Sequence, residues 1–202
     1  MRLGCTVYTL LQFVARSNRS REKSIIYSEY LRKGKSAKTV EIGCGDGSLA
    51  VLFQPKNYTG VDVSEERIES ARLNHPGYAF YDYSVLSRKF EKLCKEADFF
   101  FCTAVLHHLS EKECIKLFNI ILNFAKKGAV LVAMEPYRPE NLWENPFSYI
   151  AAKLDEGKFV RTSREWQKLL KPFLVKTIEL KGSFLWPVDG AMFRLEFKNK
   201  LK

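Results

Sequence analysis

Residues 40–48 read Val40-Glu41-Ile42-Gly43-Cys44-Gly45-Asp46-Gly47-Ser48, and this stretch decides the fold. It follows a short apolar run that is predicted as a strand, and it is expected to open a helix. Glycines at alternate positions let the backbone turn tightly and let a ligand approach without meeting a Cβ atom. The free amides of a helix N-terminus can also bind a carboxylate or a phosphate. The stretch therefore predicts a ligand-binding loop at the end of the first strand.

An acid follows each of the next two predicted strands. Asp62 lies near the end of the run Tyr58–Val63, where its carboxylate could accept hydrogen bonds from both hydroxyls of a ribose. Val63, beside it, is expected in the core. Asp82 ends the third strand, although an aspartate at this place is also typical of an ordinary turn. Together with the glycine loop, these acids indicate a nucleoside-containing ligand at the carboxyl ends of the strands.

Short apolar runs alternate with helical patterns through the middle of the chain. The runs predicted as strands are Thr39–Ile42, Tyr58–Val63, Tyr78–Tyr81, Ala97–Cys102 and Gly128–Met134. Helix start signals lie between them, at Ser64 before two glutamates and at Ser110, whose capping-box partner is Glu113. Such alternation is typical of a parallel sheet that is covered by helices on both faces.

The pattern changes after the fifth predicted strand. A loop rich in proline, asparagine and aromatic residues over Pro136–Phe147 leads into a helix, and a further helix begins near Thr162 with Glu165 as its capping-box partner. The runs Phe173–Leu180 and Ala191–Phe197 predict an antiparallel pair of strands that closes one edge of the sheet.

The spacing of the glycines separates two kinds of nucleoside-binding fold. Dinucleotide-binding folds use Gly-x-Gly-x-x-Gly, whereas here the third glycine comes one residue early, at Gly47. With Glu41 two residues before the first glycine, the loop resembles the first motif of class I S-adenosylmethionine-dependent methyltransferases. The resemblance covers about residues 39–135, with its motifs in the family's order and spacing. It implies a three-layer α/β sandwich around a mostly parallel, seven-stranded sheet whose last strand is antiparallel.

The resemblance also implies a binding site for S-adenosylmethionine, whose product is S-adenosylhomocysteine. The glycine loop would surround the methionine part, and Glu41 would bond nearby backbone or the cofactor's amino group. Asp62 would hold the ribose hydroxyls, while Asp82 and the Tyr83 amide would face the adenine. The segment after the fourth strand would line the methionine end. The cofactor-binding candidates are Glu41, Gly43, Cys44, Gly45, Gly47, Asp62, Val63, Asp82, Tyr83, Thr103 and Ala104.

Two histidines follow the fourth strand, near the place where the resemblance puts the methyl group. His107 and His108 are the catalytic candidates because either could accept a proton near neutral pH, with packing or backbone bonding as the alternative role. The acid-proline turn of the family has a counterpart at residues 134–137, which makes Tyr137 and Arg138 candidates for contacts with the substrate. No metal site is predicted, because the sulfonium methyl is already activated and positioning supplies much of the rate.

The composition fits one globular domain of 202 residues, 46% of them hydrophobic and 28% charged. Within residues 1–202 we expect a basic helical lead-in over residues 1–38, a cofactor-binding half over residues 39–135, and substrate-side helices with the final strand pair over residues 136–202. The apolar positions between Leu3 and Val14 favour an amphipathic helix over a signal peptide.

The apolar runs are too short for a transmembrane helix, which needs about 20 residues. The chain has 5 cysteines, an odd number, and they contain no Cys-x-x-Cys pair. This pattern is typical of reduced thiols and predicts a cytoplasmic protein without disulfides or structural zinc. The oligomeric state cannot be predicted from these features.

The net charge of +10 is concentrated at the two ends of the chain. Residues 1–38 hold nine Lys and Arg against two acids, residues 158–202 hold eleven against four, and the middle is mildly acidic. Because the family commonly builds its acceptor side from these flanks, we expect methyl transfer to an oxygen, nitrogen or carbon atom of a small molecule, an anionic one included. The alternative acceptor is RNA (rRNA or tRNA), and a third hypothesis is a cofactor-binding protein without turnover.

Overall fold

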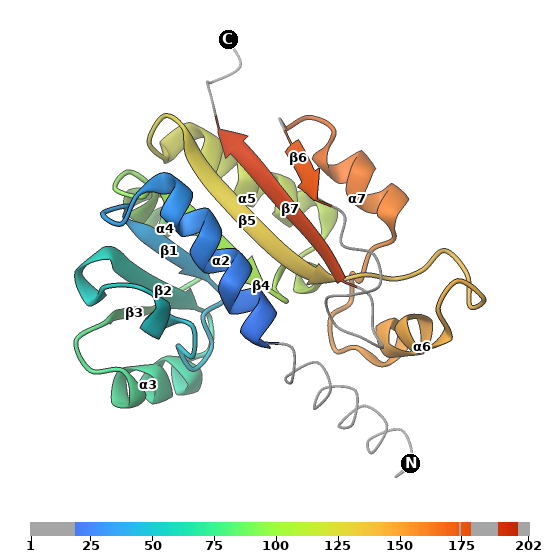
Figure 1. The fold of residues 1–202 in the computed structure, drawn as a ribbon, viewed down its shortest axis with the longest axis horizontal. Coiled ribbons are helices and arrows are strands. Elements are labelled where there is room, and N and C mark those ends of the chain that lie inside the picture. Colours follow the sequence, from blue (N-terminus) through green and yellow to red (C-terminus); the bar gives the residue numbers. More distant parts are fainter. Residues whose placement is uncertain (1–18, 174, 179–189, 198–202) are drawn as a thin grey trace.

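The computed structural model describes residues 19–173, 175–178 and 190–197, and its strands form one seven-stranded sheet (Figure 1). The strands are β1 (Thr39–Ile42), β2 (Tyr58–Asp62), β3 (Ala79–Asp82), β4 (Phe99–Thr103), β5 (Ala129–Pro136), β6 (Val175–Ile178) and β7 (Gly190–Phe197). Their order is β3-β2-β1-β4-β5-β7-β6. The first five are parallel, and β7 runs antiparallel to both β5 and β6. The expected mostly parallel sheet with an antiparallel last strand is confirmed.

Helices cover both faces of this sheet. They are α2 (Arg19–Lys33), α3 (Glu65–Asn74), α4 (Arg88–Cys94), α5 (Glu111–Phe124), α6 (Pro146–Leu154) and α7 (Ser163–Leu170). The Ser64 side chain accepts a hydrogen bond from an amide of the first turn of α3. Complete capping boxes begin α5 and α7, as the sequence predicts.

Alternate residues of the central strands divide the core into two layers. In β4, Phe99 and Phe101 pack with buried residues of α2 and α3, whereas Phe100 and Cys102 pack with α4 and α5. Figure 1 shows α2 lying across one face of the sheet, with α4 and α5 behind it. The result is the expected three-layer sandwich.

The prediction that the glycine loop opens a helix is wrong. Only two 3₁₀ turns, η1 (Ala50–Leu52) and η2 (Pro55–Asn57), connect the loop to β2. Pro55 lacks an amide hydrogen and cannot continue a helix, and Phe53 leaves the first turn to enter the core. The amides that face a ligand therefore belong to the loop itself and not to a helix N-terminus.

Parts of the sequence predictions fall outside the described residues. These are the amphipathic helix between Leu3 and Val14, the end of the run Phe173–Leu180, and Cys5. Within the described part of the chain, no helix is long and apolar enough to cross a membrane.

Candidate cofactor and acceptor site

The glycine loop has a backbone that only glycine adopts without strain. Gly43, Gly45 and Gly47 have φ angles of 67°, 53° and 75°. A Cβ atom at Gly43 would collide with Val105, and one at Gly47 would lie 2.7 Å from the Phe80 ring. A Cβ at Gly45 would meet nothing within 4 Å, so this residue faces open space. The loop is thus packed on its two sides and open in the middle, where a ligand can approach the backbone.

Asp62 and Asp82 lie side by side at the carboxyl ends of β2 and β3, where they are register partners. The Asp62 carboxylate accepts hydrogen bonds from the amides of Gly45 and Ser64, both at 2.9 Å. Each carboxylate oxygen has a second lone pair, so Asp62 can still accept ribose hydroxyls. Asp82 is about half exposed, and the Arg72 guanidinium lies 3.5 Å from it. Both acids therefore stand where the sequence predicted them.

Glu41 lies within β1 and is 3% exposed. Its partner is the Tyr58 hydroxyl, which donates a hydrogen bond to Oε2. Burial raises the pKa of Glu41 to about 8. The side chain is therefore buried between β1 and β2, and its partner is the Tyr58 hydroxyl, not the backbone or the cofactor's amino group that the sequence suggested.

The remaining candidates around the adenine position differ in exposure. Val63 follows the last ladder pair of β2 and is 74% exposed, so its placement in the core is wrong, and its side chain is open to a ligand. Cys44 is buried under the loop, close enough to β2 that a Cβ at Gly60 would lie 2.8 Å from its sulfur. Tyr83 is half-buried and stacks on Tyr81, with ring centroids 5.7 Å apart.

Ala104 marks the carboxyl end of β4 with an unusual backbone. Its φ of 54° makes it the one non-glycine residue with positive φ in the described part of the chain. This conformation is costly for alanine and is held by the hydrogen bond from its amide to the Met134 carbonyl at 2.8 Å. Thr103 is half-buried and Ala104 is exposed, so both candidates lie open beside the glycine loop.

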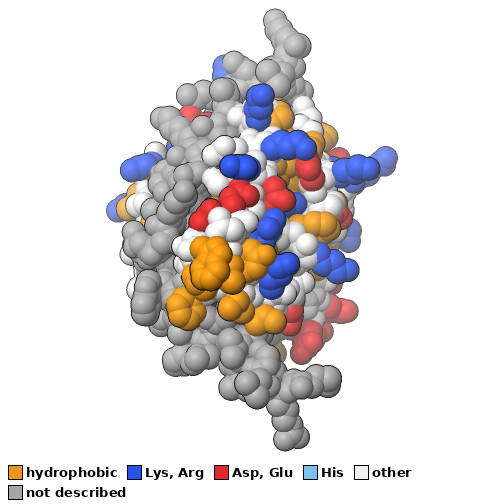
Figure 2. All heavy atoms as spheres, turned by 90° about the vertical axis from the view of Figure 1, so that its right-hand side faces the viewer, with side chains coloured by type: hydrophobic (Ala, Val, Ile, Leu, Met, Phe, Trp, Pro, Cys, Tyr) orange, Lys and Arg blue, Asp and Glu red, His pale blue; other side chains and the backbone are white. Residues whose placement is uncertain are grey.

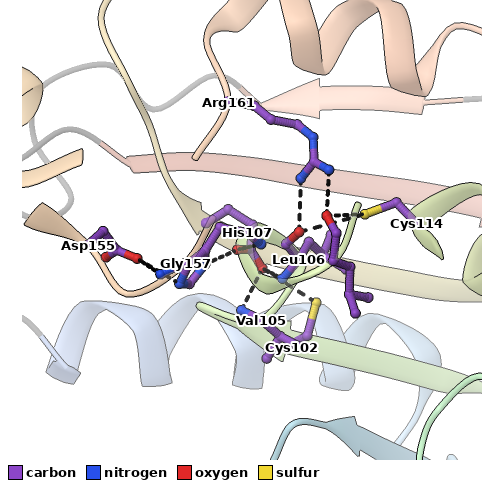
Figure 3. Close-up of polar contacts among 10 residues, drawn as sticks. Cys102, Val105, Leu106, His107, Cys114, Asp155, Gly157 and Arg161 are labelled. Atoms are coloured by element: carbon purple, nitrogen blue, oxygen red, sulfur yellow. Dashed lines mark hydrogen bonds and ion pairs between the residues drawn. The ribbon is translucent and has the colours of Figure 1, made fainter. Parts of the chain in front are cut away.

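A buried carboxylate organises the turn that follows. Glu135, at the end of β5, is 1% exposed and accepts hydrogen bonds from the amides of Val105, Leu106 and His107 at 2.9–3.2 Å. It also bonds the His107 Nδ1 atom at 2.9 Å. These amides begin the 3₁₀ turn η3 (Leu106–His108), so one carboxylate satisfies the free donors of this turn (Figure 3).

Residues 155–161, which we call the strap, cover the other side of η3 (Figure 3). The Asp155 carboxylate lies 3.4 Å from His107 Nε2. A Cβ at Gly157 would collide with the His107 ring, so the strap can approach this closely only with glycine there. Arg161 is 7% exposed and donates to the carbonyls of Leu106 and Leu109 at 2.9 and 2.6 Å. The strap and Glu135 together enclose His107.

The two candidate histidines consequently have different properties. Burial disfavours the charged ring of His107, but the hydrogen bond and charge of Glu135, with the charge of Asp155, outweigh it and raise its pKa. The side chain of His108 is exposed. The part of its ring that is withdrawn from water, and the charge of the neighbouring His107, lower its pKa. The surroundings of His107 therefore favour its cationic form, whereas those of His108 favour its neutral form.

The acceptor candidates that follow β5 are both engaged with the protein. Tyr137 is 8% exposed and belongs to the core below the turn. Arg138 donates to the Val160 carbonyl at 3.2 Å and to Glu165 at 3.0 Å, and its side chain is 29% exposed. The sequence reasoning gave Glu135 only as the acid of the acid-proline turn and did not select Asp155 or Arg161, because the roles of all three depend on contacts between distant segments.

The cysteines of the described residues are buried and free. Cys102 is 0% exposed, and burial raises its pKa well above the ordinary value, so this thiol is a core residue and not a nucleophile. Trp166, at 1% exposed, is likewise a packing residue. The described part of the chain contains no group of three or more His, Cys, Asp or Glu side chains that could hold a metal ion.

Comparisons with known proteins agree with this geometry. Residues 40–131 match the model of a methyltransferase domain. The chain has the fold of the methyltransferase domain of bacterial CtHen1, at 17% identity and a TM-score of 0.65, over 89% of this chain and 99% of that one. No curated protein sequence matches it.

Two structures solved with S-adenosylmethionine have the same fold. One is magnesium protoporphyrin IX methyltransferase from Synechocystis, at 16% identity and a TM-score of 0.64, over 92% of this chain and 83% of that one. The other is human N-acetylserotonin methyltransferase, at 17% identity and a TM-score of 0.63, over 94% of this chain and 56% of that one. The sequence match is to a methyltransferase domain and the fold is that of solved methyltransferases, so both agree with the class that the glycine loop predicts, an S-adenosylmethionine-dependent methyltransferase of class I.

The enclosure of His107 predicts a specific pH dependence of stability. Because its pKa is raised in the folded state, the stabilising contribution of this ring is complete below the unfolded pKa of about 6.5 and is lost as pH rises through the folded pKa. In urea denaturation, the stability difference between wild type and His107→Gln should therefore be largest at low pH and fall with rising pH. His108→Gln is the matched control, since the lowered pKa of His108 gives the opposite trend. A difference for His107→Gln that stays constant across this range would contradict the arrangement.

Proposed function

We propose that this methyltransferase transfers the methyl group of S-adenosylmethionine to an oxygen, nitrogen or carbon atom of a small molecule, with anionic molecules as the favoured acceptors. The observation that carries the proposal is the alignment of the open Gly45 backbone with Asp62 and Asp82 along one edge of the sheet. This edge offers backbone for the methionine part and carboxylates for the nucleoside.

The residues present fit this cofactor. Asp62 would hold the ribose hydroxyls, and Asp82 with the Tyr83 amide would bind the adenine, beside the exposed Val63 side chain. The methionine part would lie between the glycine loop and the open residues Thr103 and Ala104. The bound cofactor supplies an activated methyl group on a sulfonium ion, and the chain's own residues position the acceptor and exclude water.

The residues after β4 would serve two different purposes. Glu135 and the strap fix η3, so His107 is a positioning residue for the segment that begins at Ala104. His108 is exposed and neutral near pH 7, so it would accept the proton of a hydroxyl or ammonium acceptor. Tyr137 and Arg138 would act on the acceptor side mainly by shaping its wall, because both pack within the protein.

The proteins of similar fold support a small-molecule methyl acceptor by analogy alone. Their names describe methyltransferases of magnesium protoporphyrin IX and of N-acetylserotonin, which are small molecules. The basic ends of the chain favour an anionic acceptor, and RNA is the alternative that the same charge allows. A cytoplasmic location also stays a prediction.

The cofactor site is tested by titrating S-adenosylhomocysteine calorimetrically into three variants. Asp62→Ala and Asp82→Ala should each weaken binding about tenfold or more, the loss expected when a hydrogen bond to a charged group is removed. Glu69→Ala, an exposed acid on the neighbouring helix α3, should bind like wild type. Wild-type affinity in both Asp variants would contradict the site.

The base is tested by labelled-methyl transfer into fractionated cell extract. His108→Gln should lower the rate about a hundredfold if the acceptor must lose a proton, the lower range for general base catalysis, without changing the affinity for S-adenosylhomocysteine. Tyr27→Phe, a change at an exposed residue of α2, is the control and should leave the rate unchanged. An unchanged rate in His108→Gln would remove this residue from the mechanism. Label in a macromolecular RNA fraction would replace the small acceptor by RNA.

A further inference from the structure

An open hollow of about 700 Å³ lies between the end of α6, the strap and α7. Such a volume is within the range of small-molecule sites, which is about 300–1,000 Å³. Asp155 and Gly157, which contact His107, also form part of its wall. The hollow is therefore joined to the turn after β4 through the strap. We call it the basic hollow.

Several charged groups in the wall already have partners. Arg138 pairs with Glu165 at 3.0 Å, and Arg161 donates to two carbonyls of the η3 region. Asp155 faces His107 and accepts the Gly157 amide at 2.6 Å. These charges are balanced within the protein and do not require a ligand.

The charges of the three lysines in the wall are not neutralised by acidic partners in this way. Lys158 and Lys168 are exposed, and no acid among the described residues lies within ion-pair distance of either. Lys153 lies over the Tyr149 ring at 5.7 Å. Glu111 is the remaining acid of the wall, at the first turn of α5. Three cations against one acid give the hollow a positive potential that favours an anion.

An exposed apolar patch adjoins the basic hollow, and Figure 2 shows it as a group of hydrophobic side chains beside lysines and arginines. The large exposed hydrophobic residues of segment 142–159 are Leu142, Trp143, Phe147, Ile150, Leu154 and Phe159. Three of them recur at helical spacing on one face of α6. Trp143 is 87% exposed, and Phe159, which is 37% exposed, lines the hollow together with Ala152 and Lys153 of α6. An apolar surface of this kind marks an interaction site.

We propose that the basic hollow binds an amphiphilic anion, whose phosphate or carboxylate lies between Lys158 and Lys168 and whose apolar part lies over Phe159 and the face of α6. The inference rests on the proposed function only for the role of this ligand, which would be the acceptor. Phe159 also ties the site to the turn after β4, because its amide donates to the His107 carbonyl at 2.9 Å.

Calorimetric titration of the full-length protein tests the site with three probes: phenyl phosphate, benzoate and inorganic phosphate. The aromatic anion that matches the site should bind saturably and about tenfold or more tighter than inorganic phosphate, because only it also buries apolar surface. The tighter of the two aromatic probes identifies the anionic group. Absence of saturable binding by both aromatic probes would overturn the proposal.

Lysine variants show whether the probe binds in the basic hollow. The double variant Lys158→Gln, Lys168→Gln should weaken the better probe about tenfold or more, since each lost charge-assisted hydrogen bond costs roughly that factor. Lys116→Gln, at an exposed lysine of α5, is the matched control and should bind normally. Equal affinity in the double variant and the control would also overturn the proposal. S-adenosylhomocysteine, titrated separately into the double variant, should bind as in wild type, so failure of the cofactor site and failure of the hollow give different results.

Discussion

The contact between Gly43 and Val105 joins the two halves of the candidate site. Gly43 has a left-handed backbone, and a side chain there would collide with Val105 in the segment after β4. Val105 is held in place because its amide donates to the buried carboxylate of Glu135. The shape of the glycine loop therefore depends on a carboxylate at the end of a different strand, β5. A substitution at either place would disturb both the glycine loop and the turn after β4.

This arrangement explains why the site lies at one edge of the sheet. Parallel strands bring their carboxyl ends together, which places Asp62, Asp82 and Ala104 along the same edge as the glycine loop. The antiparallel β7 extends the sheet next to β5, and its Arg194 pairs with the buried Glu29 of α2 at 2.8 Å. The last strand thus secures the flank of β5, whose end supplies Glu135.

Local signals in the sequence were sufficient to predict much of this fold and to place the glycine loop, Asp62 and Asp82 at the carboxyl ends of the strands. The capping boxes of α5 and α7 and the apolar runs of β1 to β5 are short-range patterns, and the glycine spacing is a backbone requirement. Helix α4 was missed because Arg88 and Lys89 follow its capping residue Ser87, instead of the glutamates that mark the starts of α3 and α5. Contacts of the strap could not be predicted, because Arg161 reaches the Leu106 carbonyl across a long sequence separation. The separate states of His107 and His108 depend on the same contacts.

The central claim is that S-adenosylmethionine binds along this edge, and a crystal structure of the protein with S-adenosylhomocysteine tests it most directly. The account predicts the ribose hydroxyls at Asp62, the adenine amino group at Asp82, and the homocysteine part over Gly45 next to Ala104. A ligand bound elsewhere, or an adenosine with no contact to either carboxylate, would contradict it.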